Sequence, residues 1–431
     1  MSAVRQPGRF LPAAPGSRVT RLELFYDLVF VFAFLNVTTL LSENLKPVTL
    51  LGGAVVLALL WWCWVSFAAM GNYLRADQGV VPLIGAVTVA ALLVLMLSLP
   101  EAFDDRPGGP PGPLVFAACY LVIRGLQVFV LVTRSREQRG ALWRLSRPVI
   151  VSMALILAAA LLPPVSTHWP WVSWLRLGLW VAAVGVEFVV GPRTRNSGLT
   201  VVSAGHWAER YALILLIALG ESIIALGTGA KLTLGLPLTW PVVVAAVLGV
   251  AVIAALWWMY FDVLASALEQ KMHRTRDAAQ RAVLARTAYT YLHLPLITGV
   301  ILFALGLKRY LTTIAEARGD AWLARPAGLD DGVLFGGVII YLTTLLALEW
   351  RVVRRVRPAP VVTLVALVVA VPAVSGWPAN IGLALLALIC VALVLGGMRS
   401  GDPLRREVRQ TALEEQLATE HDQSEWRRRN L

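Results

Sequence analysis

Charged residues are scarce in this sequence. Only 15% of its 431 residues are Asp, Glu, Lys or Arg, whereas 58% are hydrophobic. A soluble domain needs roughly a quarter charged residues to cover its surface. The deficit excludes an ordinary soluble fold and predicts that much of the outer surface faces lipid. The net charge of +12 comes from basic residues in short segments between apolar runs, so we expect no nucleic-acid partner.

Cysteine and catalytic motifs are also sparse. Cys63, Cys119 and Cys390 lie far apart inside apolar runs, which predicts buried apolar side chains and no metal site. No GxSxG, Walker or HExxH motif occurs, so we expect neither an enzyme nor a bound cofactor. The first apolar run is too long for a signal peptide, and we expect it to stay as a membrane span.

Long apolar runs are abundant. A transmembrane helix needs about 20 apolar residues, and twelve runs approach or exceed this length. We therefore predict an all-α polytopic membrane protein with about twelve transmembrane helices. The fifth and eleventh runs are short and bounded by proline, so their full crossing stays open. The runs lie near 23–42, 48–70, 80–99, 113–133, 147–163, 172–191, 208–228, 240–264, 287–307, 332–350, 360–375 and 378–397.

The distribution of Lys and Arg predicts the orientation. With a cytoplasmic N-terminus, about 28 of them fall in inside segments and about 7 in outside loops. We therefore expect both termini in the cytoplasm. Two inside segments, 265–286 and 403–424, carry mixed charge and are expected to form solvated helices.

The two halves of the chain resemble each other. Paired tryptophans begin at Trp61 and at Trp257, and a Pro-Leu-Ile sequence follows each pair at Pro82 and at Pro295. Six runs in each half predict two parallel six-helix repeats. Chance similarity between tryptophan-rich helices is the alternative. The predicted divisions are a cytoplasmic N-terminal segment (1–20), the first repeat (21–191), the second repeat (206–397) and a cytoplasmic tail (398–431).

Ionisable side chains inside apolar runs cost about 2.5–3.5 kcal/mol each near the bilayer centre, so they mark helix pairing or a polar pathway. The candidates for a substrate or ion pathway are Glu23, Asp27, Glu209, Arg210, Glu221 and Asp262. Two ionised carboxylates one helical turn apart, such as Glu23 and Asp27, repel unless a cation lies between them. Either one stays protonated or a positive partner is near, and Arg21 and Arg75 are the candidates by depth. A polar cluster that only anchors the helix end is the alternative.

Spacing along the sixth and seventh runs suggests charge pairs. Arg176 and Glu187 are eleven residues apart and share a helix face, as do Arg210 and Glu221. If the two runs are antiparallel neighbours, their depths allow the pairs Arg176–Glu221 and Glu187–Arg210. Arg124 is a further candidate for a buried charge pair. Structural pairs and a transport pathway both remain open.

Two histidines lie in or beside the apolar runs. His206 precedes the seventh run, and His293 lies two residues before a proline in the ninth. Together they are candidates for a proton relay. A hydrogen-bonded helix partner is the alternative for a buried histidine.

Two segments, ELFYDLVFVFA at 23–33 and HWAERYALILLIALGESII at 206–224, resemble the low temperature requirement protein A (LtrA) family of bacterial membrane proteins. The resemblance covers the membrane region and implies a bacterial cytoplasmic membrane location and a link to growth at low temperature. It implies no reaction or substrate. A weaker similarity to six-helix-repeat potassium channels rests on Arg21, Phe25 and Asp27.

These observations predict a transporter or ion-coupled carrier whose partners are the lipid bilayer and an unknown small solute or ion. Buried carboxylates make proton coupling one option. An ion channel and a non-transporting sensor or scaffold are the alternatives, and a homodimer stays open.

Overall fold

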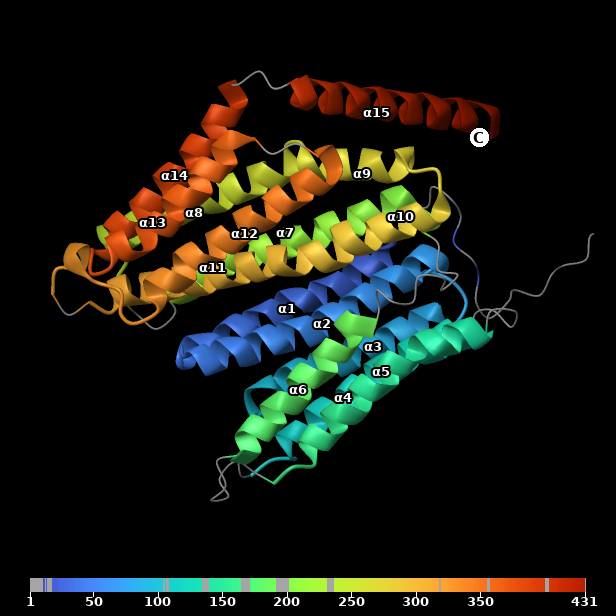
Figure 1. Cartoon of the computed structure of the whole chain (residues 1–431), viewed down its shortest axis with the longest axis horizontal. Helices are drawn as coiled ribbons and strands as arrows, with labels where there is room; N and C mark the ends of the chain where they lie inside the picture. Colours follow the sequence, from blue (N-terminus) through green and yellow to red (C-terminus); the bar gives the residue numbers. More distant parts are fainter. Residues whose placement is uncertain are drawn as a thin grey trace, which may run out of the picture. The chain divides into compact units, whose positions relative to one another are not determined.

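The computed structural model describes residues 11, 13, 18–103, 105, 108–133, 139–163, 171–190, 201–230, 236–317, 319–354, 357–399 and 403–430. This part of the chain is helical and contains no strand. Each of the twelve predicted runs falls on a helix (Figure 1). The helices that carry these runs are α1 (Arg21–Glu43), α2 (Pro47–Tyr73), α3 (Val81–Leu97), α4 (Gly112–Thr133), α5 (Arg139–Ala160), α6 (Trp171–Val190), α7 (Ala204–Gly229), α8 (Trp240–Phe261), α11 (Leu292–Ala315), α12 (Asp330–Val353), α13 (Pro358–Val374) and α14 (Ala379–Arg399).

Nine spans in the described ranges are long and apolar enough to cross a membrane. Three further apolar helices are shorter: α3, the Ser146–Ala160 part of α5, and α13. The fifth and eleventh predicted runs, which lie on α5 and α13, are thus confirmed as short. A membrane protein with many helices is confirmed, and the number of crossings stays a prediction.

The remaining helices join or follow the spans. The predicted helices at 265–286 and 403–424 are confirmed as α9 (Leu264–Arg274) with α10 (Ala278–Leu284), and as α15 (Pro403–Asn430). A π-helix at Ala285–Tyr291 leads into α11. Short 3₁₀ turns lie at Leu99–Glu101 and Ala321–Leu323.

The chain forms two compact units by its own contacts. The first comprises Met1–Glu221 and Asp277–Leu294, and the second comprises Ser222–Arg276 and Pro295–Leu431. In the first unit α4 packs on α3 and α5, α5 packs on α6, and α1 packs on α2 and α3. In the second unit α14 packs on α8 and α13, and α12 packs on α13. The predicted six-helix repeats have other boundaries and stay a prediction.

Helix α1 begins at a capping box that also positions a predicted site residue. The Thr20 side chain accepts a hydrogen bond from the Glu23 backbone nitrogen, and the Glu23 carboxylate accepts one from the Thr20 backbone nitrogen. This arrangement satisfies two backbone N–H groups that a helix start leaves without partners. The Glu23 side chain is therefore fixed at the first turn of α1.

In the second unit, glycines let α11 and α12 approach closely. A Cβ atom at Gly299 would lie 2.7 Å from the backbone nitrogen of Tyr341, and one at Gly306 would lie 2.7 Å from the Leu334 Cβ. Small residues at helix contacts bring the backbones together, which is how transmembrane helices gain packing energy without a hydrophobic driving force.

Candidate functional site

Polar side chains join α1 to α7 in the first unit. Each of three contacts links residues that are 183 positions apart. Because the offset is constant, the two helices run in the same direction with a fixed register. The contacts are Glu23–His206 at 2.9 Å, Asp27–Arg210 at 2.7 Å and Thr38–Glu221 at 2.7 Å.

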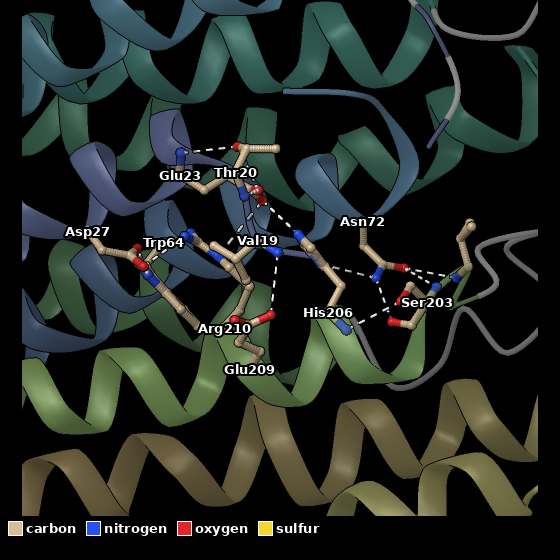
Figure 2. A network of polar contacts seen from close by, with 11 residues as sticks. Val19, Thr20, Glu23, Asp27, Trp64, Asn72, Ser203, His206, Glu209 and Arg210 are labelled. Carbon is tan, nitrogen blue, oxygen red and sulfur yellow. Dashed lines mark hydrogen bonds and ion pairs between the residues drawn. The ribbon is translucent and has the colours of Figure 1, made fainter. Parts of the chain in front are cut away.

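The Glu23 carboxylate is fully buried and accepts hydrogen bonds from Thr20 and from His206. Its Oε2 accepts from the Thr20 backbone nitrogen at 2.8 Å and from the Thr20 hydroxyl at 2.9 Å. Its Oε1 lies 2.9 Å from His206 Nε2 and 4.0 Å from Arg210 Nε. Figure 2 shows Glu23 between Thr20, the residue that caps α1, and His206 on α7.

Asp27, one turn further along α1, binds Arg210. Its Oδ2 accepts from Arg210 Nη1 at 2.7 Å, and its Oδ1 accepts from the Trp64 indole at 2.8 Å. The guanidinium carbon of Arg210 also lies 5.6 Å from the centre of the Trp64 ring. All three side chains are buried. A positive partner beside the two carboxylates was expected if both are ionised. In the described chain this partner is Arg210, so the choice of Arg21 or Arg75 was wrong.

Asn72, at the end of α2, holds the start of α7. Its Oδ1 accepts from the Val202 nitrogen at 2.8 Å, and its Nδ2 donates to the Ser203 carbonyl at 2.8 Å. These backbone partners fix the amide orientation, so Nδ2 also faces His206 Nδ1 at 3.3 Å as a donor. His206 Nδ1 must then accept. The imidazole is therefore neutral, and its Nε2–H donates to Glu23.

Glu23, Asp27, His206 and Arg210 form a polar cluster whose positive and negative charges do not cancel. Glu23 accepts three hydrogen bonds and Asp27 faces an arginine, so both are carboxylates. Arg210 supplies one positive charge and neutral His206 supplies none. The buried cluster therefore carries a net charge of about −1, which protonation of His206 would cancel.

Gly71 keeps room for the Glu23 carboxyl group. A Cβ atom there would lie 2.8 Å from Glu23 Cδ and would overlap Oε1. We expect Gly71→Ala to lower the free energy of unfolding by about 1–3 kcal/mol because Glu23 must leave His206. Gly125→Ala on α4, where the nearest atom is 3.9 Å away, is the control and should cost nothing. Equal unfolding curves in detergent would contradict the contact.

A second buried ion pair lies among α2, α4 and α6. Arg124 Nη2 donates to Glu187 Oε2 at 2.6 Å, and both side chains are buried. The Tyr120 hydroxyl donates to Glu187 Oε1 at 3.2 Å. Glu187 was predicted to pair with Arg210. That prediction is wrong, because depth allowed the pair but Arg124 and Asp27 are the partners that the helix packing provides.

Arg176 binds backbone carbonyls. It donates to the carbonyl oxygens of Ala159, Leu162 and Pro163 at 3.2, 3.1 and 2.8 Å, and to that of Phe103. These groups lie at the ends of helices or beyond them, where carbonyls lack partners within the helix. Glu221, its predicted partner, accepts a hydrogen bond from the Thr38 hydroxyl at 2.7 Å.

The other predicted pathway residues lie outside the polar cluster. Glu209 is exposed, and its carboxylate accepts from the Val19 nitrogen at 3.3 Å. His293 is buried; its Nδ1 lies 3.0 Å from the Ala288 carbonyl, and its ring stacks on Tyr289. The ring nitrogens of His206 face Glu23 and Asn72. These contacts do not include His293, the partner in the predicted proton relay.

Asp262 belongs to the second unit and binds α15. It lies just after α8 and accepts hydrogen bonds from Arg405 Nη2 at 3.1 Å and from Arg409 Nη2. The Gln270 side chain of α9 donates to the Val408 carbonyl at 3.0 Å. Figure 1 shows α15 beside α9. Asp262 therefore attaches the C-terminal helix, and its predicted place in a polar pathway gains no support from these contacts.

Asp262→Asn is expected to loosen α15. The variant weakens the partly buried ion pairs of Asp262 with α15 by about 1–2 kcal/mol. This loss should raise the population of molecules with a detached α15 roughly 5- to 30-fold. Trypsin cleavage within 403–430 of the folded protein measures that population. The control is Glu407→Gln, because the Arg274–Glu407 pair is exposed and 3.8 Å apart. Equal cleavage of both variants would contradict the role of Asp262.

Sequence reasoning missed several residues that complete the polar cluster. Asn72 carries no charge, and Gly71 acts through the absence of a side chain. Trp64 is uncharged as well, and it closely follows the paired tryptophans at Trp61 that indicated the repeat. The available signal was an asparagine after a glycine in an otherwise apolar run. Among the described residues, no group of three or more His, Cys, Asp or Glu could hold a metal ion.

Comparison with known proteins gives one family. The profile described as bacterial low temperature requirement A protein (LtrA) matches residues 18–395. An uncharacterized protein of Rhizobium meliloti (strain 1021) is 27% identical over 356 residues, which is 78% of each chain. No solved structure matches. The matched range includes α1, α2 and α7, which carry the polar cluster.

Proposed function

This chain belongs to the bacterial low temperature requirement A protein (LtrA) family, and we propose that it is a proton-coupled carrier of the cytoplasmic membrane. Both termini lie in the cytoplasm, and the chain crosses the bilayer twelve times as two parallel six-helix repeats. The family name connects this activity to growth at low temperature. The polar cluster of Glu23, Asp27, His206 and Arg210 binds the coupling proton.

The observation that carries the proposal is the position of His206 between a donor and an acceptor. Asn72 Nδ2 faces its Nδ1, and the Glu23 carboxylate faces its Nε2. A proton that binds at Nδ1 cancels the net charge of the cluster, which stabilises the buried site. The same proton turns Nδ1 into a donor, and the Asn72 amide can then no longer donate to it.

Proton binding would thus act on the contact between α2 and α7. Asn72 holds Val202 and Ser203, which lead into α7. Expelling its amide from His206 releases one of the bonds that fix this segment. A carrier needs an element with two arrangements that a bound ion biases. The end of α2 and the start of α7 supply such an element.

The parallel arrangement of α1 and α7 supports the repeat. They are the first helices of the two proposed repeats, and two repeats related by an axis along the membrane normal place equivalent helices in the same direction. The constant offset of 183 in their side-chain contacts fits that relation.

The test is proton movement in proteoliposomes that contain a pH-sensitive dye. A panel of ions and metabolites is applied outside, and the active solute is the one that changes the internal pH. His206→Gln and Glu23→Gln should abolish this signal. His273→Gln should not, because His273 is exposed on α9. A solute-driven proton signal that survives His206→Gln would overturn the proposal.

A structural polar lock is the second candidate. It is favoured by the pairing of Asp27 with Arg210 and of Glu187 with Arg124, since paired buried charges also fix helix register. In that case no solute moves protons, and the variants lose stability alone.

A further inference from the structure

The guanidinium of Arg210 has a donor edge that no described residue accepts. Its Nη1 binds Asp27, whereas Nε and Nη2 are buried and make no hydrogen bond to the described chain. Glu23 Oε1 lies 4.0 Å from Nε, beyond hydrogen-bond distance, and is bonded to His206. Arg210 is 1% exposed. Such buried N–H groups carry the full cost of desolvation.

The geometry of this edge selects a ligand. Nε–H and Nη2–H of a guanidinium point the same way as a planar fork, which fits the two oxygens of one carboxylate. The indole nitrogen of Trp207 is a further buried donor to which no described residue offers an acceptor. It lies three residues earlier on α7 and thus on a neighbouring part of the same face. Donors without acceptors need a ligand that offers lone pairs, and the positive guanidinium favours an anion among such ligands.

Charge decides how the anion can bind. The cluster carries about −1 when His206 is neutral, and a bound monoanion alone would deepen this to about −2 in a buried site. If His206 takes up one proton together with the monoanion, the total stays at about −1. The pair therefore enters without a change in buried charge.

From these observations we propose that Arg210 binds a small monocarboxylate, one molecule for each proton on His206. The proton comes from solvent and occupies Nδ1, and the carboxylate oxygens accept from Nε and Nη2 of Arg210. No covalent bond changes. This inference rests on the proposed function and names its substrate class as an anion that travels in the same direction as the proton.

Calorimetry on the full chain in lipid nanodiscs tests the pairing. Sodium formate, acetate and lactate are the probes, and sodium chloride and sodium phosphate are the comparisons. Binding in two buffers of different ionisation enthalpy should show uptake of about one proton per carboxylate, and affinity should rise about tenfold for each unit of falling pH while free His206 is uncharged. Absence of carboxylate binding, absence of proton uptake, or tighter binding of chloride or phosphate would overturn the proposal.

Variants then locate the site. Arg210→Lys keeps the charge beside Asp27 but loses the fork, so carboxylate affinity should fall roughly tenfold or more. His206→Gln should abolish the proton uptake. Glu209→Gln, on the exposed side of α7, should bind like the wild type. Each variant is used only if its unfolding curve matches a folded protein, and the wild-type measurements decide the matter without them. Unchanged affinity in folded Arg210→Lys would refute the site.

Two further outcomes separate this inference from the proposed function. If a cation or a neutral solute drives a proton signal that depends on His206, the carrier stands and the monocarboxylate site falls. If carboxylates bind with proton uptake in nanodiscs but move no protons in proteoliposomes, the site stands and the carrier falls.

Discussion

Asp27→Ala should lower the free energy of unfolding by about 3–5 kcal/mol, the usual effect of removing one partner from a buried ion pair. The loss leaves the guanidinium of Arg210 buried without the carboxylate that lies 2.7 Å from it. It also removes the acceptor of the Trp64 indole. Reversible unfolding in mixed detergent measures the change.

A double variant separates the effect of an unpaired charge on stability from the effect of lost packing. Asp27→Leu combined with Arg210→Met removes both charges and fills a similar volume, so it should recover most of the lost stability. Glu209→Gln is the control, because it removes an exposed carboxylate from the residue next to Arg210. A cost for Asp27→Ala no larger than that of Glu209→Gln would show that the pair is hydrated.

The double variant also tests function. A carrier that needs Arg210 and Asp27 should be folded and inactive after both are replaced. A structural lock should work whenever it is folded. Proton signals from the same preparation of proteoliposomes therefore distinguish the two candidate functions without relying on a destabilised protein.

The helices were predictable because of a strong physical constraint. Hydrocarbon offers no hydrogen-bond partner to a backbone, so a long apolar run must be helical. All twelve runs fall on helices for this reason. The charge list identified Glu23, Asp27 and Arg210 by the cost of burying an ionised group. Each of them lies in the polar cluster.

The pairing of these charges could not be obtained from depth alone. Glu187 has several arginines at a suitable depth, and only the packing of α4 between α3 and α5 and the approach of α6 bring Arg124 to it. A usable signal existed on α1 and α7. Glu23, Asp27 and Thr38 have the spacing of 4 and 11 that His206, Arg210 and Glu221 repeat. Two matching spacings indicate two parallel helices in register.

Asp262 shows that sequence alone can also misplace a charged residue whose partners lie far along the chain. Its position at the end of an apolar run made it look like a membrane acid, because sequence alone gives no distance to a segment 143 residues further along. The partner arginines lie in the tail that was predicted as a solvated helix. The two predictions of helices at these positions are confirmed, because α8 and α15 are both helical. The contact of Asp262 with α15 can be seen only in the tertiary structure.

Glu187→Ala is the second change with a large expected effect. Arg124 would lose its ion pair but keep the Trp62 carbonyl at 3.0 Å and the Ser66 hydroxyl at 2.6 Å. We therefore expect a cost at the lower end of about 3–5 kcal/mol, below that of Asp27→Ala, whose arginine keeps no other hydrogen bond within the described chain.

Glu187→Gln is the matched variant for this pair. The amide oxygen can still accept from Arg124, and the Tyr120 hydroxyl can rotate to accept from the new amide NH₂. The loss in free energy of unfolding should therefore be about half that of Glu187→Ala or less. No described hydrogen bond or ion pair joins Arg124 or Glu187 to Glu23, Asp27, His206 or Arg210, so neither variant should alter the pH dependence of proton movement once folded. A shifted pH profile in Glu187→Gln would place this pair in the proton pathway and extend the site from α1 and α7 to α4 and α6.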